Sequence, residues 1–564
     1  MAHSPLPDPS DSTRLPPPGS PWRTLLPILV LLGLGLLATG SSLGNGFAYD
    51  DVFIIQTNAH IHHLAAPWTY AAQNYWPTSG DLLYRPLTVW LFALQWMIGG
   101  GSPLVFHLAN VVLHLLTVIV LYRLALRLIP PLGAWFTAAL FAVHPVHAEA
   151  VANVVGQAEL VVGLVAVVGT VVYLDGRRAG ALTATRRLVL AALVVAGALA
   201  KEQGLMLPLL LAVVEVTVIR DPRPLGARLR ELAPLATMLA AAGLLVIALR
   251  TWAIGGLAGG MQAVAIRDTT VGHRALTMLA VVPHWVRLLV WPAHLQADYS
   301  PAEISAAASF GRAQLLGVAV VGAWALALYL SWRRRRHAGG ATALGLGWTA
   351  VALLPVSNVL LPTGIVLAER TLYLPSAGAC LLAGTIVVAV QSVLVRRRSA
   401  MWLGAVGSAL LLGVAAWRSS VRQPVWRDND TLLTTTVLDA PKSYRARWQL
   451  ARHLAGRDEF EPAREAFRQA LDRYPHDPRL LEDYGQLLRR MGRCAEAVRV
   501  LEQALMIDST RVMARSRLYY CLIQLGRPAD AGRVARAGLA LGDSAFGPLV
   551  DRADSAAATA GRVP

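Results

Sequence analysis

Residues 24–43 read TLLPILVLLGLGLLATGSSL, a run without charged side chains that is long enough to cross a bilayer as a helix. The run lacks a cleavage pattern of small residues, so we expect a retained anchor rather than a signal peptide. The rest of the chain has a similar character, because 55% of its 564 residues are hydrophobic and 15% are charged. Soluble domains carry about 25% charged residues. The sequence therefore predicts an all-α protein whose larger part lies in a lipid bilayer.

The formal charge of +17 comes largely from short arginine clusters between apolar stretches. This pattern is typical of the cytoplasmic loops of membrane proteins and argues against nucleic-acid binding. Placing the clusters in the cytoplasm predicts a cytoplasmic N-terminus and about 11 crossings. After the first, the expected spans lie near residues 105–127, 133–150, 158–174, 188–201, 204–219, 233–250, 314–332, 341–359, 371–394 and 400–417.

Two further apolar stretches, residues 84–100 and 273–291, cannot cross without moving arginines to the wrong side. We expect them to lie flat at the outer surface, where their tryptophans suit the interface. The long loops 44–104 and 251–313 are then outside the cytoplasm, and so is everything after Trp417. These expectations describe an integral, multi-pass protein of a plasma (inner) membrane.

A 34-residue period begins where the chain turns polar: Ala463, Ala497 and Ala531 fall one period apart. Small and large apolar residues at this spacing pack paired helices into an α-solenoid. The pattern predicts about three tetratricopeptide repeats, an array that binds a protein or peptide. The third repeat is weaker, with Gly538 where alanine is expected, and is a candidate cap.

The predicted organisation has five segments. They are a disordered tail over 1–21, a transmembrane domain over 22–420, a linker over 421–443, the repeats over 444–545 and a disordered tail over 546–564.

The loop after the first span opens with Tyr49, Asp50 and Asp51. Adjacent carboxylates repel each other, which raises the pKa of one of them and suits a general base. The plain alternative is a helix cap or a solvated loop start.

The outer end of the third span carries His144, His147 and Glu149. Two histidines and a glutamate could hold a metal, but their spacing differs from the i, i+4 histidine pair of a zinc helix. We therefore favour orientation or hydrogen bonding of a substrate and expect no metal to be required.

Lys201 and Glu202 lie at the outer interface between the fifth and sixth spans, and lysine occurs elsewhere only at Lys442. Charges at a membrane edge are costly and are usually functional or paired. Lys201 either neutralises a phosphate as a compact point charge or forms an interfacial anchor with Glu202.

The tenth span starts with Glu369, Arg370 and Tyr373. Arg370 could clamp phosphate oxygens while Glu369 or Tyr373 positions it, and a plain juxtamembrane anchor is the alternative. Arg85 and the turn that begins at Asp298 are weaker candidates on the same face. These polar groups are all predicted on one side of the membrane, although the topology was derived from arginines elsewhere.

Five short motifs occur along the chain ahead of the repeats. They are YDD at 49–51, YRPL at 84–87, HPVHAEAVA at 144–152, AKE at 200–202 and ERTLY at 369–373. Over nearly the whole chain, their order and spacing resemble the transmembrane and tetratricopeptide repeat-containing family of O-mannosyltransferases. The resemblance implies a GT-C fold and transfer of a sugar, usually mannose, from a polyprenyl-phosphate donor. The acceptors would be serine or threonine hydroxyls on the outer face, glycosylated with inversion.

By this resemblance, Asp50 is the catalytic base and Asp51 its support or substitute. Lys201 and Arg370 would stabilise the departing phosphate, so that no metal cofactor is needed. Two features depart from the family. Gln157 and Glu159 stand where an arginine and an aspartate are typical, so an expected cation is missing, and the repeat array is short.

Two other functions fit the sequence. The membrane part could anchor a repeat scaffold for envelope assembly without catalysis, or the enzyme could be a ligase or polymerase acting on lipid-linked glycans. A transporter fits less well, because the polar residues cluster at one face instead of lining the bilayer midplane.

Overall fold

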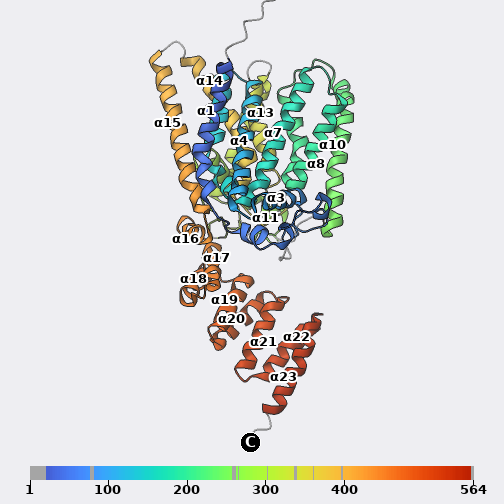
Figure 1. Cartoon of the computed structure of the whole chain (residues 1–564), viewed down its shortest axis with the longest axis vertical. Helices are drawn as coiled ribbons and strands as arrows, with labels where there is room; N and C mark the ends of the chain where they lie inside the picture. Colours follow the sequence, from blue (N-terminus) through green and yellow to red (C-terminus); the bar gives the residue numbers. More distant parts are fainter. Residues whose placement is uncertain are drawn as a thin grey trace, which may run out of the picture.

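The computed structural model describes residues 21–76, 82–256, 262–263, 266–267, 269–301, 303–335, 339–359, 361–394 and 398–560. Every regular element within these ranges is helical. Figure 1 shows two parts, a bundle of upright helices and an array of shorter helices at one end of it. The predicted all-α class is confirmed. Most of the N-terminal segment expected to be disordered, residues 1–20, lies outside the described residues.

Seven described segments are long and apolar enough to cross a membrane, so the chain is a multi-pass membrane protein. They belong to α1 (Pro21–Thr39), α4 (Pro103–Leu126), α7 (Gln157–Arg178), α10 (Leu225–Ile254), α12 (Arg312–Arg333), α14 (Tyr373–Leu394) and α15 (Arg398–Arg422). The remaining principal bundle helices are α3 (Pro86–Gly99), α5 (Pro131–Val143), α8 (Ala184–Ala200), α9 (Leu207–Thr217), α11 (Val271–Val290) and α13 (Gly340–Leu353). The count of about 11 crossings stays a prediction, as does the flat orientation of α3 and α11.

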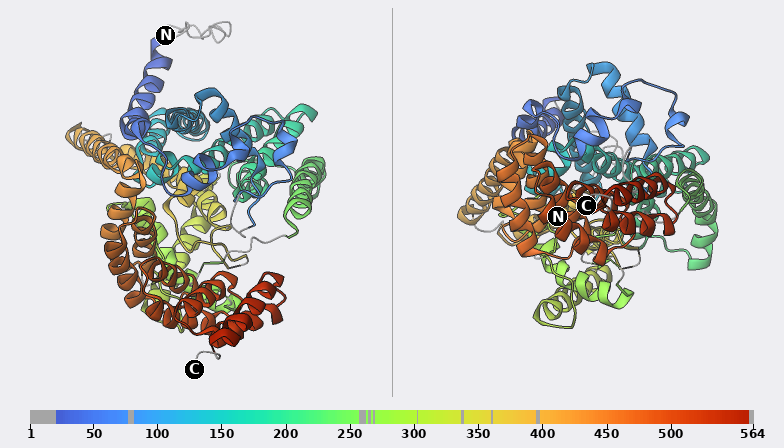
Figure 2. Two further views of the ribbon diagram at one scale, coloured as in Figure 1. Left: turned by 60° about the horizontal axis from the view of Figure 1, so that its bottom comes forward. Right: turned by 90° about the horizontal axis from the view of Figure 1, so that it is seen from below.

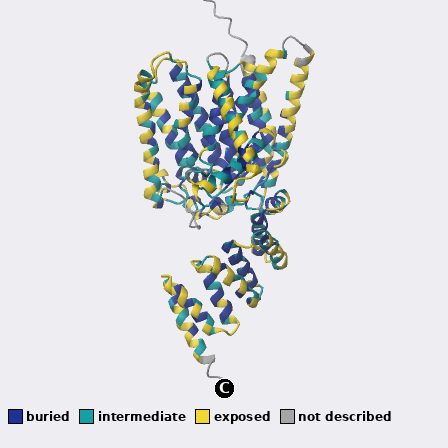
Figure 3. Cartoon of the chain, turned by 180° about the vertical axis from the view of Figure 1, so that it is seen from behind, coloured by how far each residue is buried: buried dark blue, intermediate teal, exposed yellow. Residues whose placement is uncertain are grey.

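The helices at the rim of the bundle turn large apolar side chains outward. Leu326 on α12 and Leu410 on α15 are 57% and 64% exposed, and Figure 3 shows such exposed residues along the outer helices. Apolar surface of this extent is unfavourable in water and is expected against lipid. Inside, small residues bring helices close together: a Cβ on Gly345 of α13 would lie 2.7 Å from the carbonyl oxygen of Gly378 on α14.

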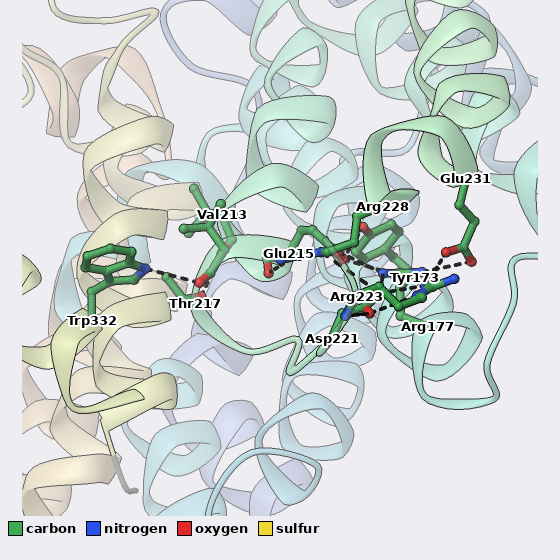
Figure 4. Close-up of polar contacts among 11 residues, drawn as sticks. Tyr173, Arg177, Val213, Glu215, Thr217, Asp221, Arg223, Arg228, Glu231 and Trp332 are labelled. Atoms are coloured by element: carbon green, nitrogen blue, oxygen red, sulfur yellow. Dashed lines mark hydrogen bonds and ion pairs between the residues drawn. The ribbon is translucent and has the colours of Figure 1, made fainter. Parts of the chain in front are cut away.

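A network of buried charges lies at the end of the bundle where α7 terminates (Figure 4). Arg177, near the end of α7, donates to Glu215 at 2.8 and 3.0 Å and to Asp221 and Glu231 at 3.0 Å. Arg228 also donates to Glu215, at 2.8 Å. The Arg177 side chain is 2% exposed, so its charge depends on these partners. The network ties α7, α9 and α10 together at this end.

Short helices form the opposite end of the bundle, facing the repeats. They are η2 (Gly40–Gly44), η3 (Val52–Gln56), η4 (Ala59–Ile61), α2 (Pro67–Tyr70), η5 (Pro145–His147), α6 (Ala148–Ala152), η6 (Val154–Gly156), η7 (Glu202–Met206) and η10 (Glu369–Leu372). The predicted polar motifs fall on or beside these short elements. The chain changes direction at each of these short helices. Side chains that are adjacent in sequence can therefore contact different parts of the bundle.

The repeats follow one another along a curve beneath the bundle (Figure 2). Three helix pairs make the array: α17 (Tyr444–Gly456) with α18 (Phe460–Arg473), α19 (Pro478–Arg490) with α20 (Cys494–Ile507), and α21 (Val512–Gln524) with α22 (Pro528–Ala540). Ala463, Ala497 and Ala531, the residues that revealed the period, are all 0% exposed in its core.

Two segments differ from the predictions. Residues 421–443, expected as a linker, contain η11 (Gln423–Trp426) and α16 (Asn429–Asp439), which connect α15 to the first repeat. The segment from 546, expected to be disordered, contains α23 (Gly547–Ala560) after η12 (Ser544–Phe546). Phe546 is 2% exposed and packs so closely on Gly538 that a Cβ there would lie 2.6 Å from its ring. The glycine that weakened the third repeat thus admits Phe546, and η12 and α23 follow α22 as a terminal cap.

Candidate active site

The two adjacent aspartates have different surroundings. Asp51 is 1% exposed, and its carboxylate accepts hydrogen bonds from the N–H groups of Val155, at 2.9 Å, and Val154, at 3.2 Å. Burial raises the pKa of Asp51 to about 7, although these hydrogen bonds oppose the shift. Asp51 therefore holds the turn that leads into α7, as the plain interpretation of a cap suggested.

Asp50 keeps a more open carboxylate. Its side chain is 19% exposed, and Oδ2 lies 3.8 Å from Nη1 of Arg370. Burial raises the pKa of Asp50, while the positive charges of Arg370, Arg445 and Arg85 act against that shift. Of the two aspartates, Asp50 has the geometry of a base that can receive a proton.

Glu149 fixes the position of Arg370. One carboxylate oxygen accepts a hydrogen bond from the Arg370 backbone N–H at 2.9 Å, and the other lies 3.2 Å from its Nη1. Glu149 is 4% exposed, whereas the Arg370 side chain is 17% exposed. The guanidinium is therefore held between Glu149 and Asp50 with part of its surface open.

Glu369 and Tyr373 do not position Arg370 by direct contact, contrary to the prediction. Glu369 accepts hydrogen bonds from the Gln296 N–H at 2.5 Å and the Tyr299 hydroxyl at 2.8 Å, which fixes the second long loop. The Tyr373 hydroxyl lies 3.0 Å from His114 Nδ1 inside the bundle. Because the chain turns at η10 and at the start of α14, Glu369 faces the second long loop and Tyr373 faces the bundle interior.

Lys201 and Glu202 have separate partners, so the alternative of an anchor formed between them is wrong. Lys201 pairs with Glu159, and its side chain is 12% exposed. Glu202 lies 3.1 Å from Arg85 and 3.1 Å from Arg250. Burial raises the pKa of Glu202, but Arg85, a backbone hydrogen bond, Arg250 and Lys201 together lower it to about 2. Lys201 directly after α8, Arg250 on α10 and Arg85 in the first long loop therefore each pair with a carboxylate.

The histidines belong to the interior of the bundle. His144 Nε2 lies 3.1 Å from the Leu289 carbonyl oxygen, and His147 Nε2 lies 2.7 Å from the Ser376 hydroxyl. Since Glu149 faces Arg370, the three candidate metal ligands have separate partners. Among the residues that the structure describes, no group of three histidine, cysteine, aspartate or glutamate side chains is arranged to hold a metal.

The two residues that depart from the family motif, Gln157 and Glu159, also have partners. Gln157 is 0% exposed and exchanges hydrogen bonds with Gln95 at 2.8 and 3.2 Å, and it donates to Asn110 at 3.0 Å. Glu159 supplies the carboxylate that faces Lys201. Position 157 therefore contributes to a buried amide network, while position 159 contributes to the charged site.

Arg370 and Glu149 line a cavity at this end of the bundle. Its walls come from the loop around residues 297–301, from residues 364–368 and from the first repeat helix α17. The predicted polar motifs and the repeats thus meet at one end of the bundle.

Sequence reasoning missed Arg445 and gave no partner to Asp298, two residues at the cavity wall. Arg445 Nε lies 3.8 Å from Asp298 Oδ1. Arg445 lies within a polar repeat helix where arginine is common, so its sequence context carries no signal. The Asp298 turn was recognised as a weak candidate because it lies on the same face as the other motifs.

Comparison with known proteins agrees with both parts of the chain. The family described as YpiA-like, C-terminal tetratricopeptide repeats matches residues 445–509, which confirms the predicted repeats. Mouse protein O-mannosyl-transferase TMTC3 is 28% identical over 489 residues, covering 81% of this chain and 52% of its own length. The protein O-mannosyl-transferase F38B6.6 of Caenorhabditis elegans is 27% identical over 368 residues, covering 64% and 51%. The curated relatives are O-mannosyl-transferases.

Human protein O-mannosyl-transferase TMTC1 is also similar, with 26% identity over 510 residues that cover 82% of this chain and 56% of its own length. The chain spans about half the length of these curated relatives. The resemblance inferred from the motifs is confirmed. Among solved structures, the oligosaccharyltransferase AglB of Archaeoglobus fulgidus gives a TM-score of 0.41 with 12% identity, covering 78% of this chain and 60% of that one.

Proposed function

We propose that this protein is a GT-C membrane glycosyltransferase that transfers mannose from a polyprenyl-phosphate donor to serine or threonine hydroxyls of proteins. The observation that carries the proposal is the partly exposed Asp50 carboxylate beside Arg370, which lines a cavity shared with the first repeat. The O-mannosyl-transferase relatives support the choice of sugar and acceptor. We further propose that this end of the bundle faces away from the cytoplasm, in a plasma membrane.

In the proposed reaction, Asp50 takes the proton of the acceptor hydroxyl. The acceptor oxygen then attacks the anomeric carbon from the face opposite the phosphate. The bond between that carbon and the phosphate oxygen breaks, and its electron pair leaves with the polyprenyl phosphate. Because this is a single displacement, the configuration of the sugar inverts.

The paired charges suggest how the leaving phosphate is stabilised. Before reaction, Arg370 faces both Asp50 and Glu149, and Lys201 faces Glu159. When Asp50 accepts the acceptor proton, its charge is neutralised, and Arg370 keeps Glu149 as its one close carboxylate. The positive charge of Arg370 would then be available to the phosphate as it leaves and gains negative charge. An interaction that strengthens in the transition state accelerates the reaction. A divalent ion is not part of this proposal.

The deciding experiment measures sugar release and transfer from radiolabelled polyprenyl-phosphate-mannose by purified protein in detergent. Asp50→Asn is compared with wild type and with Asp472→Asn, a control at an exposed position on α18. We expect Asp50→Asn to lose turnover and the control to keep it. Activity that survives Asp50→Asn defeats the assignment of the base.

The same experiment separates the other candidate functions. A scaffold would give no sugar release with any donor, and its cellular role would depend on the repeats alone. A ligase acting on glycans would transfer the sugar to a lipid-linked oligosaccharide but not to a serine-containing or threonine-containing peptide.

A further inference from the structure

The cavity beside Arg370 is made jointly by the membrane part and by the segment that leads into the repeats. The membrane part contributes Val366 and Leu367, and the connecting segment contributes Trp426 and Leu433. All four side chains are largely buried, with 3 to 6% exposed. The cavity therefore has apolar walls and a polar side, where Arg370 and Arg445 lie.

Specific contacts hold the first repeat against the membrane part. The Ser443 hydroxyl, which caps α17, donates to Asp298 at 2.6 Å and lies 2.9 Å from the Ser300 hydroxyl. The Lys442 N–H donates to Glu303 at 2.8 Å. Because Lys442 and Ser443 directly precede α17, these bonds fix the start of this helix against the second long loop.

The first long loop is held in the same way. The Tyr49 N–H donates to the side chain of Asn429 at 2.7 Å, and the Gly46 N–H donates to the Arg427 carbonyl oxygen at 2.8 Å. Tyr49 adopts a φ of 57°, an unfavourable region for a non-glycine residue, directly before Asp50. The loop that carries the candidate base is thus attached to the same segment as the repeats.

Arg445 is the cation that α17 brings to this cavity. Its side chain is 29% exposed, and its close carboxylate, on Asp298, is 3.8 Å away. Asp298 already accepts hydrogen bonds from Ser443 and from the Ser300 N–H at 3.0 Å. Within the described part of the chain, the Arg445 guanidinium donates no hydrogen bond, so its donors are available to a bound molecule.

We propose that this cavity binds the acceptor polypeptide as a short extended segment and that Arg445 positions it by donating to its backbone carbonyl oxygens. The inference rests on the proposed glycosyltransferase function. Asp50 follows Tyr49 and lies 3.8 Å from Arg370, and both of these residues line the cavity, so a hydroxyl on such a segment would come close to the base. The carboxylates of Asp50, Glu149 and Asp298 disfavour acidic neighbours, whereas the apolar walls favour an acceptor residue flanked by an apolar side chain.

The donor would approach Lys201 and Arg85, which face Glu159 and Glu202 and are not among the residues that line this cavity. This arrangement gives the two substrates separate binding groups. In this proposal the first repeat binds the acceptor at the reaction site itself, whereas the later repeats could bind it elsewhere.

The test measures two activities of the full-length protein in detergent: release of mannose from the donor without acceptor, and transfer to a short threonine peptide with apolar flanking residues at varied concentration. For Arg445→Gln we expect the KM for the peptide to rise about tenfold or more, as for loss of a charged hydrogen-bond donor. Transfer should fall at least tenfold more than donor hydrolysis. Arg445→Lys, which keeps the charge and loses the planar donor array, should restore part of the effect.

The control is Arg452→Gln on the same helix, because Arg452 is 47% exposed and faces Asp483 of the second repeat at 3.4 Å. A second variant, Gln449→Trp, places a bulky side chain at the cavity wall and should raise the KM for the peptide as well. Equal losses of hydrolysis and transfer in Arg445→Gln, or an unchanged KM in both cavity variants, would overturn this inference alone. Wild-type protein that neither hydrolyses nor transfers the donor would overturn the proposed function and the acceptor site with it.

Discussion

Glu149 contacts Arg370 through both carboxylate oxygens, one at the backbone N–H and one at the guanidinium, although 221 residues separate the two in the chain. This double contact fixes both the turn at η10 and the direction of the cation. Arg370 can face Asp50 because Glu149 holds it there.

Replacing Glu149 with glutamine should therefore impair catalysis more than folding. The amide retains an acceptor for the Arg370 N–H but loses the charge, so Arg370 should bind the Asp50 carboxylate more strongly and make it a weaker base. We expect turnover to fall about 10²-fold, in the range for a misplaced catalytic group. Initial rates and the apparent pKa of the rate profile would be compared with those of Glu149→Asp. A profile identical to that of wild type would contradict the role given to Glu149.

Asp50→Asn and Asp51→Asn should separate activity from stability. Loss of a general base lowers turnover by about 10² to 10⁴-fold, and we expect this for Asp50→Asn with little change in melting temperature. Asp51→Asn should instead destabilise the fold by about 1–3 kcal/mol, because its side chain can no longer satisfy the Val154 and Val155 N–H groups equally well. Thermal unfolding and sugar release measured on the same preparations test the pair. Loss of turnover in Asp51→Asn with loss of stability in Asp50→Asn would instead make Asp51 the base and Asp50 the structural residue.

The pH dependence of stability should contain a contribution from Asp51. Its pKa is raised to about 7 in the folded protein, against about 3.9 for an exposed aspartate, so the folded state binds more protons between these values. The contribution is complete below about pH 4 and is lost as the pH rises through 7. We expect the melting temperature of wild type to fall from pH 5 to pH 8 by more than that of Asp51→Asn. Parallel curves would show that another group dominates.

The charge network remote from the site predicts a purely structural phenotype. Arg177→Gln removes the most buried cation of the network, while Glu215 keeps Arg228 and Asp221 keeps Arg223, so the expected cost is about 1.5–3 kcal/mol. The protein that still folds should keep the KM of wild type for donor and acceptor. The control is Arg178→Gln, at the exposed neighbouring position. A changed KM with unchanged thermal stability would argue that the two ends of the bundle are coupled.

Hydrophobic length and arginine placement predicted that the polar motifs share one end of the bundle, and the structure places them together there. It could not assign their partners. Lys201 and Glu202 are adjacent in sequence, but a one-turn helix starts between them, and they bind Glu159 and Arg85 respectively. Such pairings depend on how distant helices pack, which the periodicity of a single segment does not determine.

Periodicity predicted the repeats but not the helix that follows them. The 34-residue period predicted the three helix pairs because each repeat carries its own small apolar residues. Phe546 and α23 lie beyond the last period, so the pattern gave no reason to expect order there. Their packing on Gly538 became evident only from the three-dimensional structure.

The hydrogen bond from Ser443 to Asp298 has a consequence for how such proteins can diversify. Ser443, which caps the first helix of the array, also donates to a loop of the membrane part. A recombination breakpoint at residue 443 would therefore separate the two parts of the chain that form one pocket. A breakpoint after α18 would leave that pocket whole and exchange only the distal repeats. New target preferences could then be inherited through the outer helices while the chemistry at the membrane stays unchanged.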